Sequence, residues 1–359
     1  MFFVIGTRPE IVKMAPIIQE CEKRDIDHYL LHTGQHYSVK MSGSFFADLE
    51  LKQPDINLDI GSGTHSEQTA KALLGIEREL MKYRPDVVLV QGDTNAVLSA
   101  ALAAAKMNIP IGHVEAGLRS YDTSMPEEHN RRLTDHVSTF LFAPTNESAN
   151  ILRRENVWGE IHVTGNTVID AIERVSRKAA ELYNQSRYAS IKDFVLMTLH
   201  RAENVDHRKT LAEIVSGVSA LDEKILFPAH PRTIARMKEF GIYEQVENEK
   251  IIEIIDPVGY LEFMGLMMNS KYILTDSGGI QEEVTAPSIN KHAFVLRTST
   301  ERPEAVQTGH VTVVGVNANE IQRNIHKKIQ HGITTNRPSP YGDGRASVKI
   351  IDILSDKFP

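Results

Sequence analysis

Two acidic residues stand where the sequence predicts the carboxyl ends of buried strands. Asp93 follows an apolar run that begins at Val87, and Glu115 follows one that begins at Ile111. Open parallel sheets bind ligands at the carboxyl ends of their strands, so both carboxylates are expected to face one cleft. Paired acids of this kind are suited to proton transfer.

Another acidic pair follows Pro126, in a pattern typical of a helix start. Glu127 and Glu128 can act in catalysis there, or they can simply match the dipole at the amino end of a helix. This second interpretation is the commoner one for such a pattern and stays open.

The densest polar cluster is Asp276-Ser-Gly-Gly-Ile-Gln-Glu-Glu283, which follows the apolar run Tyr272 to Leu274. A strand that passes through Ser277-Gly-Gly279 into a helix offers free N–H groups to an anion, which favours a diphosphate site. Glu283 can then accept hydrogen bonds from sugar hydroxyls. The alternative is a glycine turn that only permits tight packing.

Basic and imidazole side chains follow other predicted strands. Gly6-Thr-Arg-Pro-Glu10 and Lys13 begin a helix, which predicts a phosphate site at Arg8 and Lys13 or else a plain turn with solvated charges. His200 ends a strand in the second half of the chain, while His230 lies between prolines and can equally be structural. Neither a complete G-x-G-x-x-G nor a His pair with a partnering Glu occurs, so we expect no dinucleotide cofactor and no metal.

The elements that must position these residues alternate between short apolar runs and longer stretches of helical period. This alternation predicts two successive doubly wound α/β domains with parallel sheets. The expected strands are 2–5, 29–32, 87–90, 109–114 and 139–142, then 194–199, 225–227, 251–255, 272–274, 294–296 and 311–314.

We place the domain boundary near Thr164 to Ala171. The first domain is expected to cover residues 1–167 and the second residues 168–344, with residues 345–359 packing back onto the first.

Composition narrows the class of protein. With 359 residues, of which 41 % are hydrophobic, the chain is long enough for two domains. A net charge of −7 without a basic block makes nucleic acid an unlikely partner. The single cysteine, the absence of a signal-peptide pattern and the lack of an apolar run of roughly 20 residues together predict a cytoplasmic protein outside the membrane.

Six motifs in order closely resemble the non-hydrolysing UDP-N-acetylglucosamine 2-epimerases: Gly6-Thr-Arg-Pro-Glu10, Gln91-Gly-Asp-Thr94, His113-Val-Glu-Ala-Gly-Leu-Arg119, Pro126-Glu-Glu128, Asp276 to Glu283, and Thr300-Glu-Arg-Pro-Glu304. The resemblance implies a GT-B-like fold of two Rossmann-like domains, an active site in the interdomain cleft and a homodimer in polysaccharide biosynthesis. Thr33-Gly-Gln-His36 also resembles the start of a regulatory site, although the residues after His36 depart from that pattern.

The resemblance also implies roles for particular residues. Asp93, Glu115 and Glu127 match the proton-transfer acids, with His200 beside the leaving diphosphate. The residues that match the UDP-binding positions are Arg8, Lys13, His200, Phe263, Ser277, Gly278, Gly279, Glu283 and Arg302.

The implied reaction is reversible epimerisation at C2 of a UDP-N-acetylhexosamine without a cofactor. The C2 proton is not acidified by a carbonyl, so UDP leaves first and a 2-acetamidoglucal forms. The proton must then return on the opposite face, which requires at least two acids. The alternatives are a hydrolysing epimerase, a GT-B glycosyltransferase and an inactive sugar-nucleotide sensor.

Overall fold

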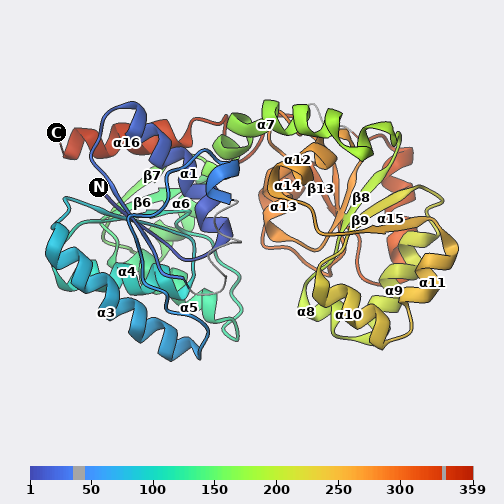
Figure 1. Ribbon diagram of the computed structural model, residues 1–359, viewed down its shortest axis with the longest axis horizontal. Helices are drawn as coiled ribbons and strands as arrows, with labels where there is room; N and C mark the ends of the chain where they lie inside the picture. Colours follow the sequence, from blue (N-terminus) through green and yellow to red (C-terminus); the bar gives the residue numbers. More distant parts are fainter. Residues whose placement is uncertain (35–44, 334–336, 359) are drawn as a thin grey trace. The chain divides into compact units, whose positions relative to one another are not determined.

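The computed structural model describes residues 1–34, 45–333 and 337–358. The chain divides into two compact units, and each is described by itself. Unit 1 comprises Met1–Arg174 and Tyr341–Pro359, and unit 2 comprises Val175–Pro340 (Figure 1). Of the Thr33 to His36 motif, Gln35 and His36 lie outside the described residues.

Unit 1 is built on a parallel sheet of seven strands in the order β3-β2-β1-β4-β5-β6-β7. Its strands are β1 (Phe2–Ile5), β2 (Tyr29–His32), β3 (Ile56–Asn57), β4 (Val88–Gln91), β5 (Ile111–Val114), β6 (Phe140–Ala143) and β7 (Glu160–Val163). The central strands are buried on both faces, as their continuous apolar runs require. The strand order reverses between β1 and β4, which is where such sheets open toward a ligand.

Helices cover both faces of this sheet. They are α1 (Arg8–Lys23), α3 (His65–Tyr83), α4 (Asn95–Lys106), α5 (Pro126–Val137), α6 (Asn146–Arg154) and α16 (Ala346–Lys357). Although α1 and α16 come from opposite ends of the chain, they pack side by side (Figure 1). The carboxylate of Asp170 accepts hydrogen bonds from the backbone N–H groups of Ala346 and Ser347 at 3.1 and 2.7 Å, and thereby holds the start of α16. Asp170 lies in α7 (Thr167–Gln185), the helix that continues into unit 2.

Unit 2 repeats this plan with six parallel strands in the order β10-β9-β8-β11-β12-β13. Its strands are β8 (Val195–Thr198), β9 (Ile225–Pro228), β10 (Ile252–Ile255), β11 (Ile273–Thr275), β12 (Ala293–Val295) and β13 (Val311–Val313). The order reverses between β8 and β11. The expectation of two doubly wound parallel sheets is therefore confirmed.

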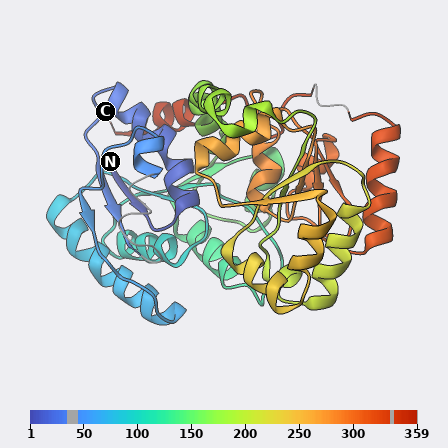
Figure 2. The same cartoon turned by 45° about the vertical axis from the view of Figure 1, so that its right-hand side comes forward.

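The helices of unit 2 follow its strands in turn, and α9 packs against α15 on one side of the sheet (Figure 2). They are a 3-10 turn (Arg187–Ser190), α8 (Ala202–Val205), α9 (Arg208–Ser219), α10 (Pro231–Glu239), α11 (Tyr243–Glu249), α12 (Tyr260–Asn269), α13 (Gly278–Glu283), α14 (Pro303–Gln307) and α15 (Ala318–Gln330).

Two strands of unit 1 were not expected from the sequence. β3 has only two residues, and β7 pairs with β6 although two of its four side chains are exposed. Both lie at the edges of the sheet and are not buried on both faces, so neither carries the apolar run that marks a central strand. No helix within the described ranges is long and apolar enough to cross a membrane.

Candidate active site

A buried charge pair lies at the switch point of the unit 1 sheet. Lys13 on α1 contacts Glu115, the first residue after β5, with 2.5 Å between Nζ and Oε2. Gln91 at the end of β4 donates to the same oxygen at 2.6 Å. The two side chains of the ion pair are only 11 % and 7 % exposed. Charge-assisted hydrogen bonds of this kind favour the ionised form of the carboxyl group.

Glu115 also adopts an unusual backbone conformation, with φ at +70°. For a residue with a Cβ this left-handed conformation costs on the order of 1 kcal/mol, and such costs concentrate at functional sites. The turn continues to Gly117, at φ +84°, where an added Cβ would lie 2.4 Å from the carbonyl oxygen of Ser148. The turn that aims Glu115 therefore depends on a glycine two residues later.

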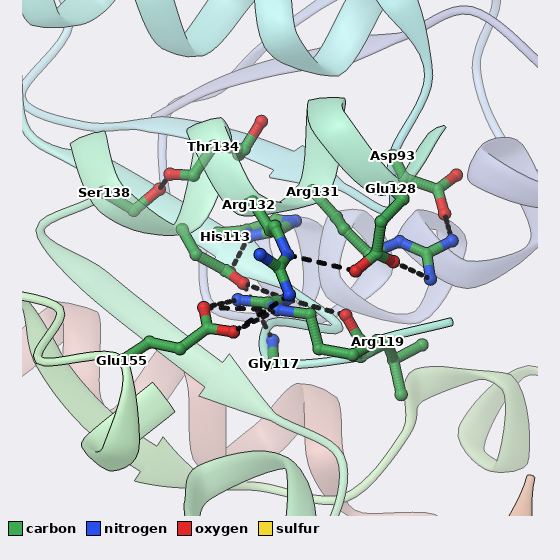
Figure 3. A network of polar contacts seen from close by, with 12 residues as sticks. Asp93, His113, Gly117, Arg119, Glu128, Arg131, Arg132, Thr134, Ser138 and Glu155 are labelled. Atoms are coloured by element: carbon green, nitrogen blue, oxygen red, sulfur yellow. Dashed lines mark hydrogen bonds and ion pairs between the residues drawn. The ribbon is translucent and has the colours of Figure 1, made fainter. Parts of the chain in front are cut away.

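Asp93 lies two residues beyond β4 and is held by α5. Arg131 donates to its Oδ2 (Figure 3). Asn130 donates from Nδ2 to the backbone oxygen of Asp93 at 2.9 Å. The Asp93 side chain remains 31 % exposed, so it is oriented without being enclosed. The predicted acids Asp93 and Glu115 thus occupy neighbouring strand ends of one sheet.

The two acids that begin α5 have different surroundings. Glu128 is buried and accepts hydrogen bonds from Ser120 N at 2.8 Å and from Arg132 Nε at 3.1 Å. Burial acts to raise the pKa of Glu128, but the bonds from Ser120, the charge of Arg131 and the hydrogen bond from Arg132 lower it from its ordinary value. Glu127 is half-buried, and no described residue forms a hydrogen bond or ion pair with its carboxylate. Glu128 therefore fixes the local structure, whereas Glu127 retains a carboxylate able to react.

A buried polar network adjoins the turn that carries Asp93 (Figure 3). The sequence analysis did not single out this network as functional. His113 on β5 contacts Asp135 Oδ1 through Nδ1 at 2.7 Å and the carbonyl oxygen of Gly92 through Nε2 at 2.8 Å. Arg119 contacts Asp135 Oδ2 at 2.8 Å and Glu155 at 2.6 Å. The available signal was one polar residue, His113, inside the otherwise apolar strand β5.

In unit 2, a buried carboxylate organises the ends of β8 and β11. Asp276 accepts hydrogen bonds from the backbone N–H of Arg201 at 2.9 Å and from Asn204 Nδ2 at 3.1 Å, and lies 3.2 Å from Nδ1 of His200. Burial acts to raise the pKa of Asp276, but the contact with His200 and the backbone N–H bonds lower it. The ring of His200 is 46 % exposed and is oriented through Nδ1, so Nε2 is the ring nitrogen that could contact a ligand.

The Ser277-Gly-Gly279 segment leads from the end of β11 into the first turn of α13. A Cβ built on Gly278 would come no nearer than 3.6 Å to any atom, and one on Gly279 no nearer than 3.8 Å. These are ordinary contact distances, so packing inside the protein does not require glycine at either position. This observation favours the ligand-binding interpretation of the turn over the packing one.

The remaining predicted residues lie on nearby elements. Arg302 precedes α14 and donates to the buried carboxylate of Glu282 on α13. Glu283 ends α13 one residue later, and Phe263 is half-buried on α12. In unit 1, the guanidinium of Arg8 lies 5.4 Å above the ring of Phe45. Within the described part of the chain, no three potential metal-ligating side chains come together.

One further acid at the switch point predicts a pH effect on stability. Glu10 is 2 % exposed at the third position of α1, where it accepts hydrogen bonds from the backbone N–H groups of Gly6 and Thr7. Burial raises the pKa of Glu10 from 4.5 to about 7, against the lowering effect of these bonds. The protonated form of Glu10 is therefore favoured in the folded protein. Its contribution to stability is complete below the pKa that Glu10 has in the unfolded chain, and it is lost as the pH rises through about 7.

In the wild-type protein, the ionisation of Glu10 is expected to lower the unfolding free energy by on the order of 3 kcal/mol between about pH 4 and pH 8. Glu10→Gln cannot ionise at this position, so this pH-dependent decrease should be missing in the variant. Urea titrations across this pH range, monitored by hydrogen exchange in β1, measure the difference in unfolding free energy between wild type and variant. Glu67→Gln is the matched control, because Glu67 occupies the same position in the solvent-exposed capping box of α3. A wild-type loss that persists in Glu10→Gln would contradict the assignment to Glu10.

Comparisons with known proteins give one consistent picture. The family model for UDP-N-acetylglucosamine 2-epimerase matches residues 19–355. A UDP-N-acetylglucosamine 2-epimerase of Methanocaldococcus jannaschii is 47 % identical over 98 % of both chains. The crystal structure of the M. jannaschii UDP-GlcNAc 2-epimerase in complex with UDP-GlcNAc and UDP superposes with a TM-score of 0.86, at 45 % identity and 99 % coverage of both chains.

A Pseudomonas aeruginosa relative, a UDP-2,3-diacetamido-2,3-dideoxy-D-glucuronate 2-epimerase, is 37 % identical over 98 % of both chains. The likeness to solved UDP-GlcNAc 2-epimerases confirms the GT-B-like fold class of this chain.

Proposed function

The chain belongs to the UDP-N-acetylglucosamine 2-epimerase family of isomerases, and we propose that it reversibly interconverts UDP-N-acetylglucosamine and UDP-N-acetylmannosamine without releasing the free sugar. The observation that carries the proposal is the buried cluster of Lys13, Gln91 and Glu115 at the switch point of unit 1. It presents an oriented carboxylate at the end of β5, and a second acid, Asp93, follows the neighbouring strand β4.

The chemistry requires a leaving group to depart before any proton moves. Loss of UDP from C1 creates an oxocarbenium-like centre, which acidifies the C2 proton, and removal of that proton gives a 2-acetamidoglucal. Return of a proton to the opposite face of C2 and re-addition of UDP at C1 complete the inversion. No electrons are transferred overall, so the reaction needs no redox cofactor.

Unit 1 supplies the proton-transfer groups in this proposal. Glu115, held ionised by Lys13 and Gln91, is suited to accept a proton. Asp93 and Glu127 retain partly exposed carboxylates, and either can serve the opposite face of the sugar.

Unit 2 supplies groups for the UDP moiety. The oriented ring of His200 and the N–H groups of Ser277 to Gly279 are suited to stabilise the departing diphosphate. Arg302, Glu283 and Phe263, on or next to α14, α13 and α12, are the other residues of unit 2 that the proposal assigns to UDP. Arg8 and Lys13, both on α1, are the residues of unit 1 that it assigns to UDP.

Gly279→Ala tests the glycine turn directly. The added methyl has room within the protein and lies in the first turn of α13, so stability is expected to stay unchanged or rise slightly. The methyl would occupy space that a bound diphosphate needs, and we expect the dissociation constant of UDP to rise at least about tenfold, a cost of about 1.4 kcal/mol. Isothermal titration with UDP and a thermal melt give the two values. Gly241→Ala is unsuitable as a control because the φ of Gly241 is +71°. Gly259→Ala is a matched control, because the φ of Gly259 is −67° and a Cβ built there would meet no atom of the described residues within 4 Å.

The decisive experiment is proton NMR of UDP-N-acetylglucosamine with the purified protein in D2O, without cofactor or acceptor. UDP-N-acetylmannosamine with deuterium at C2 supports the proposal. Free N-acetylmannosamine with UDP would instead identify a hydrolysing epimerase. A requirement for an acceptor would identify a glycosyltransferase, and binding without exchange would identify a sensor.

A parallel incubation with UDP-2,3-diacetamido-2,3-dideoxy-D-glucuronate tests the substrate of the P. aeruginosa relative. Faster exchange with that sugar would move the substrate assignment to it while leaving the reaction class intact. A cytoplasmic homodimer remains part of the proposal, and sedimentation of the purified protein tests the dimer.

A further inference from the structure

The ring of His113 has hydrogen-bond acceptors at both nitrogens. The partner of Nε2 at 2.8 Å is the carbonyl oxygen of Gly92, which can only accept a hydrogen bond. The partner of Nδ1 at 2.7 Å is Oδ1 of Asp135. His113 is 1 % exposed, so water does not substitute for either partner.

The carboxyl group of Asp135 has hydrogen-bond donors around its other oxygen as well. Its other oxygen, Oδ2, lies 2.8 Å from Nη1 of Arg119 and 3.3 Å from the backbone N–H of Gly117, and both of these are donors. Arg119 and Asp135 side chains are fully buried. With a carboxyl oxygen on one side and a carbonyl oxygen on the other, both contacts are hydrogen bonds only if both ring nitrogens of His113 donate.

The group that His113 contacts belongs to the turn that carries Asp93. Gly92 O is fixed by His113, and the next carbonyl, Asp93 O, is fixed by Asn130 Nδ2 at 2.9 Å. The two successive peptide groups of this turn are therefore held from β5 and from α5. A Cβ built on Gly92, whose φ is +84°, would meet no atom within 4 Å in the described part of the chain, so nothing there packs against the turn in that direction.

We propose that His113, held as an imidazolium by Asp135, is a positioning residue that fixes the Gly92-Asp93 turn so that Asp93 stands in register with the substrate for proton transfer. The inference rests on the proposed role of Asp93 and adds residues that do not themselves touch the sugar. A charged donor strengthens the bond to Gly92 O relative to a neutral imidazole. The Arg119 and Asp135 pair then acts through His113 on Asp93.

Two variants of His113 separate its two hydrogen bonds. Glutamine places its amide nitrogen near the position of Nε2 and can still donate to Gly92 O, whereas asparagine places it near Nδ1 and reaches only Asp135. We expect His113→Asn to lower kcat about a hundredfold, the effect of a displacement of about 1 Å at a reacting group. His113→Gln is expected to stay within about tenfold of wild type, and KM and UDP affinity are expected to change little in both. Equal losses of kcat in the two variants, or losses that fall on KM, would overturn the proposal.

The charge of the ring is measured independently of catalysis. In 15N-labelled wild-type protein at neutral pH, we expect the His113 ring to show both nitrogens protonated, with the signal assigned by its disappearance in His113→Gln. A ring protonated on one nitrogen only would overturn the imidazolium. If the ring is doubly protonated but Asp93→Asn turns over normally, the proposed role of Asp93 fails and the assignment of the His113 charge stands.

Discussion

Asp93→Asn is expected to lower kcat by about 10³-fold while changing the dissociation constant of UDP less than about threefold. The amide oxygen can still accept from Arg131, so the turn keeps its orientation, but the amide cannot take up or release the proton. General acid–base groups typically contribute 10²- to 10⁴-fold, and the site contains other acids that do not replace the missing one on its own face. Steady-state kinetics and isothermal titration measure the two quantities.

The matched control for this variant is Asp86→Asn. Asp86 is exposed and precedes β4 at the amino end of the strand whose carboxyl end leads to Asp93. We expect full activity from it. If Asp93→Asn weakened UDP binding as much as it lowered kcat, Asp93 would belong to the nucleotide site and its proton-transfer role would be wrong. Incorporation of deuterium at C2 in D2O supplies a third readout, which should fall in parallel with kcat.

Lys13→Met is expected to destabilise unit 1 by about 3 kcal/mol and to abolish most of the activity. The substitution removes one partner of a buried ion pair, while the hydrogen bond from Gln91 to the carboxylate of Glu115 stays in place. Uncompensated buried charges typically cost 3–5 kcal/mol, and the bond from Gln91 places the expectation at the lower end. Urea titration followed by hydrogen exchange in β1 and β5 measures the loss in unit 1.

The double variant Lys13→Met with Glu115→Gln separates stability from chemistry. Because the amide at position 115 carries no charge that Lys13 would have to balance, much of the lost stability should return, while the activity should not. Were the double variant as unstable as the sum of the single ones, the two side chains would not be coupled as the structure indicates. A double variant with restored activity would remove Glu115 from the proposed mechanism.

The sequence alone supported most of the fold because the strands that matter are buried. Runs such as Val87 to Val90 must lie in a sheet with both faces covered, and the polar residues directly after them must lie at its carboxyl edge. β3 and β7 escaped the same reasoning because edge strands bury little and therefore carry a weak apolar signal.

The pairing of side chains was beyond this reasoning. Lys13 and Glu115 are 102 residues apart, and only the strand order of the folded sheet brings α1 and the end of β5 together. The sequence suggested a phosphate for Lys13 but could not indicate the carboxylate of Glu115 that the structure places beside it. No role could be assigned to His113 from the sequence for a related reason. The role of a buried histidine can be inferred only when its hydrogen-bond partners, here Gly92 and Asp135, are known.

The discontinuity of unit 1 has a consequence for how the protein is made. Unit 2 is one uninterrupted stretch, Val175–Pro340, whereas unit 1 lacks α16 until Tyr341–Pro359 have left the ribosome. Domains generally fold as units in the order in which they are synthesised. Unit 2 can thus fold while the face of α1 that α16 will cover is still open to solvent, so unit 1 can complete its packing only after unit 2 has been synthesised.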